Sequence, residues 1–213
     1  MVDYSVLEEF ERALSKYTGA PYVVLTDSCT HAIELCLRYL KYDGPVILPN
    51  RTYLSVPMLI YKLGLQLYYD KDYKWQYEYR LAPTNVWDSA RALDRRMFVN
   101  DRMQCLSFGP GKRLEIGRGG AILTNSRNDY YILKTMANDG RRLHIKPWQD
   151  QQFFSLGFHY NMRLEEAVKG KAMLKNKELK IIQYSYYLFL VLVSYFAIIR
   201  MHRLIPNIGL SQG

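Results

Sequence analysis

Lys112 is the residue of this 213-residue chain whose surroundings best suit covalent chemistry. It lies between glycine-rich turns in the segment Ser107 to Ala121, directly after the apolar run Met103 to Phe108. A lysine that is partly removed from water loses preference for its charged form, so its amine can act as a nucleophile. Such an amine can form a Schiff base with an aldehyde. Glycines let the main chain approach a bound ring or phosphate closely. The segment therefore predicts a site for an aldehyde cofactor.

Three further segments carry polar or aromatic side chains where strands are expected to end. Ser28, Cys29 and Thr30 precede an expected helix, where hydroxyls and main-chain N–H groups suit a phosphate. A serine or threonine at that place is more often a simple helix cap. Asp88 could stabilise a protonated ring nitrogen, or it is an ordinary strand-end aspartate in a turn. Tyr53 could stack on a cofactor ring, or it packs at a helix start.

The composition predicts a globular protein with affinity for anions. Apolar residues make up 49% of the chain, and lysine and arginine (29) exceed aspartate and glutamate (20) by nine. The basic residues are spread out, without an aromatic RNA-binding motif or zinc-finger spacing, so a dedicated nucleic-acid binder is not expected. Three cysteines lack pairing or metal-ligand spacing, and the N-terminus is acidic. Both features predict a cytoplasmic protein without an export signal.

Helical and strand patterns alternate along much of the chain. Helices are expected at 6–17, 31–41, 53–63, 129–137 and 164–179, and strands at 22–26, 45–48, 65–69, 85–88, 103–108 and 120–124. Residues 71–80 are polar and rich in tyrosine, which predicts a loop or an edge hairpin. The alternation predicts an α/β fold, a three-layer sandwich whose sheet is mainly parallel.

Taken together and in this order, the motifs resemble the DegT/StrS family of sugar aminotransferases. Members of that family use pyridoxal 5'-phosphate (PLP) and have the type I aminotransferase fold. The similar segments are Phe10-Glu11 with Tyr17–Ala20, Thr26–Ala32, Leu48–Tyr53, Asp88–Leu93, Ser107–Ala121, Asp139–Arg141 and Leu156–Met162. The resemblance implies that residues 1–180 form a shortened PLP-binding large domain.

The resemblance also implies a role for each site residue. Lys112 would bind PLP covalently and carry a proton between substrate and cofactor, Asp88 would hold the ring nitrogen, and Tyr53 would cover one ring face. The phosphate would be bound by Ser28, Cys29, Thr30 and Ser107. The implied reaction moves an amino group from glutamate to the keto group of a nucleotide-linked deoxysugar. The implied assembly is a homodimer.

Several residues differ from the family pattern. Arg91 stands where the family commonly has a glutamine that touches the ring hydroxyl. His159 replaces an asparagine that reaches the phosphate of the neighbouring subunit, and Asn161 replaces an arginine nearby. The stretch between Asp70 and Asp88 is much shorter than in full-length members, and the small C-terminal domain of the family is not expected after about residue 180. An alternative function is therefore that of a degenerate, non-catalytic relative that binds the cofactor or another protein.

Residues 181–213 form a tail of different composition. The run 181–199 is apolar and uncharged, and it is flanked by Lys180 and Arg200. Its length suits a membrane-associated segment. Two alternatives stay open: a helix packed on the sheet or across a dimer, which would cover its apolar surface, and the remnant of a chain that lost its original C-terminus.

Overall fold

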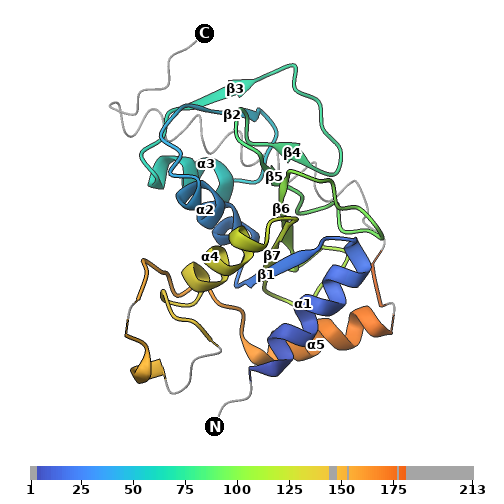
Figure 1. Cartoon of the computed structure of the whole chain (residues 1–213). Helices are drawn as coiled ribbons and strands as arrows, with labels where there is room; N and C mark the ends of the chain where they lie inside the picture. Colours follow the sequence, from blue (N-terminus) through green and yellow to red (C-terminus); the bar gives the residue numbers. More distant parts are fainter. Residues whose placement is uncertain (1–3, 144–147, 153, 177, 181–213) are drawn as a thin grey trace.

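The computed structural model of the protein describes residues 4–143, 148–152, 154–176 and 178–180. Its elements, drawn in Figure 1, are α1 (Ser5–Thr18), β1 (Tyr22–Thr26), α2 (Cys29–Tyr39), β2 (Val46–Pro49), α3 (Ser55–Lys62), β3 (Leu67–Asp70), β4 (Tyr79–Arg80), β5 (Val86–Asp88), β6 (Met103–Ser107), β7 (Gly120–Thr124), α4 (Arg127–Ala137), the short 3-10 helix η1 (Trp148–Asp150) and α5 (Leu164–Lys175). The predicted elements therefore form, with ends shifted by a few residues. The tail 181–213 lies outside the described residues.

The main sheet is mixed, so the prediction of a mainly parallel sheet is wrong. Its strand order is β1-β7-β6-β5-β4. β5 and β6 are parallel, whereas β7 runs antiparallel to both β1 and β6, and β4 runs antiparallel to β5. The reason lies in the connections, since a parallel return needs a long crossover, usually a helix. Residues 108–119, which join β6 to β7, are all described and form no helix.

A short hairpin joins the main sheet to a second, parallel pair of strands, β2 and β3. β4 and β5 form this hairpin. Of residues 71–80, predicted as a loop or an edge hairpin, 71–78 form no strand and only Tyr79–Arg80 belongs to the hairpin. Just after β4, the backbone N–H of Ala82 donates to the carbonyl of Ile47 at 3.1 Å, and the N–H of Ile47 donates to the carbonyl of Ala82 at 2.8 Å. The hairpin therefore does not form a free edge but connects β2 to the rest of the sheet.

Helices cover both faces of the sheet, which confirms the three-layer arrangement. Figure 1 shows α1 and α5 side by side on one face and α2 and α4 on the other. β1 contributes to both cores, because Val24 packs among the residues of α2, α3 and α4, while Val23 and Leu25 pack among those of α1 and α5. This alternation is the two-residue period of a strand that is buried on both faces.

The close approach of α1 and α5 depends on Gly170. A Cβ at this position would lie 2.5 Å from Cζ of Phe10, a fully buried ring in the core between the two helices. We expect Gly170→Ala to lower the free energy of unfolding by about 1–3 kcal/mol, because the helices must separate or the ring must leave its rotamer. Urea unfolding measures the change. Val168→Ala, on the exposed side of α5, is the control and should change stability much less; equal losses would contradict the packing argument.

Within the part of the chain that the structure describes, no helix is long and apolar enough to span a membrane. The predicted membrane-associated segment, 181–199, falls outside that part.

Candidate active site

Lys112 is a buried amine in the loop between β6 and β7. Its side chain is 7% exposed, and its backbone N–H donates to the carbonyl of Gly109 at 3.3 Å. Burial lowers the pKa of Lys112, and the nearby positive charge of Arg91 lowers it further, whereas Asp88 and Cys29 act in the opposite direction. The net result is a pKa below that of an ordinary lysine. A larger share of the amine is therefore unprotonated, and nucleophilic, near neutral pH.

Asp88 is a buried carboxylate at the end of β5, and it is 6% exposed. Its Oδ1 accepts hydrogen bonds from the backbone N–H of Ala90 at 3.0 Å and from the thiol of Cys29 at 3.8 Å. Its Oδ2 accepts from the hydroxyl of Tyr79 at 2.7 Å. Cys29 stays a thiol because burial, followed by the charge of Asp88, raises its pKa well above the usual value. Among the groups that oppose the lowering of the Lys112 pKa, the charge of Asp88 acts most strongly.

The turn before α2 lies directly against the start of β7. Ser107, at the end of β6, pairs with Gly120 of β7, and Ser28 bridges to the neighbouring Gly119. A Cβ on Gly120 would lie 2.5 Å from the carbonyl carbon of Ser28 and 2.6 Å from the nitrogen of Cys29. Glycine is the one residue type that allows this approach. The structure thereby brings three of the predicted phosphate-binding residues into one place.

The hydroxyls of the same turn make hydrogen bonds within the protein. Ser28 caps α2, because its Oγ accepts from the backbone N–H of His31 at 3.2 Å. The capping interpretation of Ser28 is therefore confirmed. The Oγ1 of Thr30 lies 2.7 Å from the Oγ of Ser55, the first residue of α3. The starts of α2 and α3 consequently meet beside the turn.

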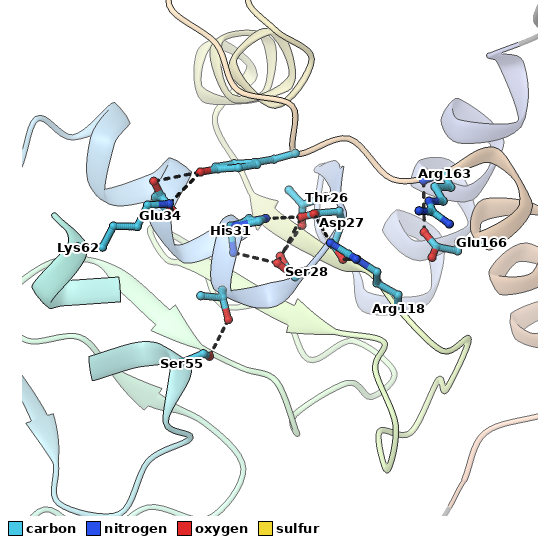
Figure 2. A network of polar contacts seen from close by, with 12 residues as sticks. Thr26, Asp27, Ser28, His31, Glu34, Ser55, Lys62, Arg118, Arg163 and Glu166 are labelled. Carbon is cyan, nitrogen blue, oxygen red and sulfur yellow. Dashed lines mark hydrogen bonds and ion pairs between the residues drawn. The ribbon is translucent and has the colours of Figure 1, made fainter. Parts of the chain in front are cut away.

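Charged side chains flank the turn on its outer side. Figure 2 shows Asp27 between His31 and Arg118: Oδ1 of Asp27 lies 2.6 Å from Nδ1 of His31, and Oδ2 lies 2.8 Å from Nη2 of Arg118. Burial alone would raise the pKa of Asp27, but the hydrogen bonds and charges of these two partners outweigh burial and lower the pKa. Asp27 therefore stays ionised and orients both partners.

Tyr160, in the segment just before α5, packs over α2 through an aromatic stack. The ring of Tyr160 lies 3.7 Å from the ring of His31, centroid to centroid, with 6° between the planes. The hydroxyl of Tyr160 donates to Oε1 of Glu34 at 3.3 Å, and Lys62 donates to Oε2 of the same buried carboxylate at 2.9 Å. Two helices and this segment are thus tied together beside the turn.

The structure brings some of the predicted site residues together and leaves others apart. The charges of Asp88 and Arg91 act on Lys112, Cys29 donates its thiol to Asp88, and Arg91 is buried, with 8% exposure. Tyr53 is 48% exposed and lies just ahead of α3. The remaining predicted residue is His159. Its side chain is 79% exposed and pairs with Asp139 at 3.1 Å. It does not belong to the buried group.

Two residues of the buried group were missed by the sequence analysis, namely Tyr79 and Thr52. The hydroxyl of Tyr79 bonds both to Asp88 and to the Oγ1 of Thr52, and both side chains are 2% exposed. Tyr79 stands in a tyrosine-rich stretch with no periodic pattern, so nothing in the sequence distinguished it from its neighbours. Thr52 was passed over in favour of the adjacent tyrosine.

Comparison with known proteins identifies the relatives of this chain. The model of the DegT/DnrJ/EryC1/StrS aminotransferase family matches residues 1–74 and 89–182. NtdA from Bacillus subtilis, solved with the bound cofactor PMP, is 20% identical with a TM-score of 0.63, covering 80% of this chain and 48% of NtdA. Spr1654 from Streptococcus pneumoniae, described as a sugar aminotransferase and solved in its PMP form, is 20% identical with a TM-score of 0.65, covering 80% and 58%.

A third structure, of DesI in the presence of its TDP-sugar product, is 15% identical with a TM-score of 0.64, covering 82% of this chain and 54% of DesI. The sequence has no match among the curated proteins. The chain spans about half the length of the three structures named here. At these identities the likeness concerns the fold, which is that of type I PLP-dependent aminotransferases. Because the family model matches more than half of the residues, the chain belongs to the DegT/DnrJ/EryC1/StrS aminotransferase family.

Proposed function

We propose that the chain is a PLP-dependent sugar aminotransferase that takes amino groups from glutamate and gives them to a nucleotide-linked keto-deoxysugar. One observation carries the proposal: Lys112 and Asp88 are both buried, burial lowers the pKa of Lys112, and the charge of Asp88 acts on the same amine. An aldehyde cofactor with a basic ring nitrogen needs this pair, an amine to bind the aldehyde and an anion for the protonated ring.

The residues present fit this cofactor. PLP, when bound, supplies the electron sink for breaking bonds at the amino-bearing carbon. Lys112 would bind the cofactor and accept or return a proton through its Nζ, and Asp88 would hold the ring proton. The backbone at Ser28 and Cys29, which Gly120 approaches without a Cβ, would bind the phosphate. The hydroxyls of Thr30 and Ser107 would complete that contact.

Three other residues have proposed roles on less direct grounds. Arg91 would lie near the ring hydroxyl, since it is buried and interacts with Lys112. Tyr53 would cover the ring, and His159 would act from the surface, across a homodimer interface; both side chains are exposed, which leaves them free to meet a ligand or a second subunit. The sugar substrate is inferred from the family and from DesI, which was solved with a TDP-sugar product.

Borohydride reduction tests the proposal. We expect the purified chain, mixed with PLP and reduced, to carry one cofactor on the peptide that contains Lys112. Lys134 is an internal reference, because it too is largely enclosed, but the charge and hydrogen bond of Glu11 outweigh burial and raise its pKa. A protonated amine is not a nucleophile. Label on Lys134 and other lysines in equal amounts, or no label, would refute the proposal.

Addition of glutamate separates transfer from binding alone. In an active enzyme, glutamate converts bound PLP to the amine form, which changes the absorbance of the cofactor. An unchanged spectrum, with Lys112 labelled, would identify the chain as a cofactor-binding relative without transfer activity. A set of nucleotide-linked keto sugars, added to the amine form, would then reveal the acceptor by restoring the original absorbance.

A further inference from the structure

Tyr79 stands in a segment to which the family model does not extend. The model matches residues 1–74 and resumes at 89, so the hairpin of β4 and β5 falls in the gap. Within that hairpin, Tyr79 pairs directly with Asp88 across the two strands. Directly opposed residues of an antiparallel pair project their side chains to the same face of the sheet. The hairpin therefore places a tyrosine beside the carboxylate proposed to support the cofactor ring.

The contact between the two side chains is a buried, charge-assisted hydrogen bond. The phenol of Tyr79 donates to Oδ2 of Asp88 at 2.7 Å. Burial, and then the negative charge of Asp88, raise the pKa of Tyr79 well above its usual value, so the phenol keeps the proton that it donates. Because that proton is directed at Asp88, the oxygen of Tyr79 is left to accept from the hydroxyl of Thr52. Thr52, Tyr79 and Asp88 thus form a chain of hydrogen bonds.

We propose that Tyr79 is a positioning residue for the cofactor site, an inference that rests on the proposed function. It fixes the carboxylate of Asp88 in the orientation that supports the protonated ring nitrogen of PLP. An ionised carboxylate has about four acceptor positions. The backbone N–H of Ala90 and the thiol of Cys29 donate to Oδ1, and Tyr79 donates to Oδ2. These bonds on both oxygens hold the carboxylate in one orientation, so the position left on Oδ2 keeps a fixed direction.

Removal of the phenol hydroxyl isolates this role. In Tyr79→Phe the ring keeps its tilted contact with Trp75, whose centroid lies 4.9 Å away, but Oδ2 of Asp88 loses its donor. A buried carboxylate oxygen without a donor is costly, so Asp88 rotates or takes up a proton. Either change weakens its interaction with a protonated ring. We expect the Kd for PLP to rise about tenfold, the usual scale for a lost hydrogen bond to a charged group.

A double-mutant cycle tests whether Tyr79 acts through Asp88. PLP affinity is measured by absorbance titration for the wild type, Tyr79→Phe, Asp88→Asn and the double variant. We expect Tyr79→Phe to weaken binding about tenfold in the wild type and less than about twofold in the Asp88→Asn background, because coupled residues are not additive. Tyr69→Phe is the matched control. Its hydroxyl is enclosed and has no hydrogen-bond partner among the described residues, so PLP affinity should not change.

A second readout follows the protonation of the bound cofactor. The pH at which its absorbance changes should shift in Tyr79→Phe and stay unchanged in Tyr69→Phe. Equal losses of affinity in both backgrounds, or a Tyr79→Phe variant with wild-type affinity and spectrum, would overturn the inference and leave the proposed function intact. A wild type that binds no PLP would overturn both.

If Tyr79→Phe does not fold, Thr52→Val replaces it. In this variant PLP binding should weaken about threefold, and only when Asp88 is present. No loss in that variant would overturn the inference.

Discussion

The Lys112→Arg variant is expected to lose covalent attachment of PLP and at least about a thousandfold of amino transfer, the scale of a lost nucleophile and proton carrier. Arginine keeps the positive charge, but its guanidinium does not deprotonate in proteins, so it can neither attack the aldehyde nor accept a proton. Turnover with glutamate and borohydride labelling measure the two losses. Transfer activity near that of the wild type would exclude Lys112 as the reactive amine.

Lys169→Arg is the control for this experiment. The Nζ of Lys169 donates to the carbonyl of Ile116, in the same loop, at 2.9 Å. The same substitution is therefore made next to the site but outside the buried group, and activity should be retained.

In the wild type, the rate of covalent PLP capture should rise with pH, because only the neutral amine reacts. The rate should level off below the ordinary lysine pKa of 10.5, because burial lowers the pKa of Lys112. A rate still rising at that pH would contradict the lowered pKa.

The second large effect is expected for Gly120→Ala. A single methyl group at this position would lie 2.5 to 2.7 Å from three backbone atoms of Ser28 and Cys29. Backbone atoms cannot yield as the end of a flexible side chain does, so the turn must move away from β7. We expect the free energy of unfolding to fall by about 1–3 kcal/mol or more and the Kd for PLP to rise at least about tenfold. Urea unfolding and PLP titration measure both effects.

Gly109→Ala is the matched control for this variant. Gly109 belongs to the lysine loop, but a Cβ there would meet the Oγ of Ser107 at 3.7 Å, an ordinary contact. It should bind PLP as the wild type does. If Gly120→Ala also bound PLP with full affinity, the turn before α2 would not be the phosphate site.

Local sequence patterns were sufficient to locate the elements of the fold. The apolar residues Leu7, Phe10 and Leu14 recur at helical spacing, and all three are buried in α1. Gly19 ends that helix in a left-handed conformation, with a φ of 83°. Patterns of this kind depend on interactions between residues that are close in the sequence, which is why a single chain reveals them.

Strand direction and side-chain partners depend on contacts between distant segments, and these were predicted less well. The alternation of strands and helices favours a parallel sheet, yet β7 inserts between β1 and β6 in the opposite direction. The approach of Cys29 to Asp88 joins residues 59 positions apart. The resemblance to a family assigned Cys29 and Asp88 to one cofactor site but did not predict their contact. Tyr79, which shares with Asp88 the hairpin outside the matched residues, was found in the structure alone.

The two hydrogen bonds between Ile47 and Ala82 let the segment after β4 cover the open side of β2. A strand can satisfy the main-chain groups of its neighbour in either direction, but only a parallel neighbour needs a long crossover. The antiparallel contact at Ala82 therefore closes this side of β2 without a crossover helix.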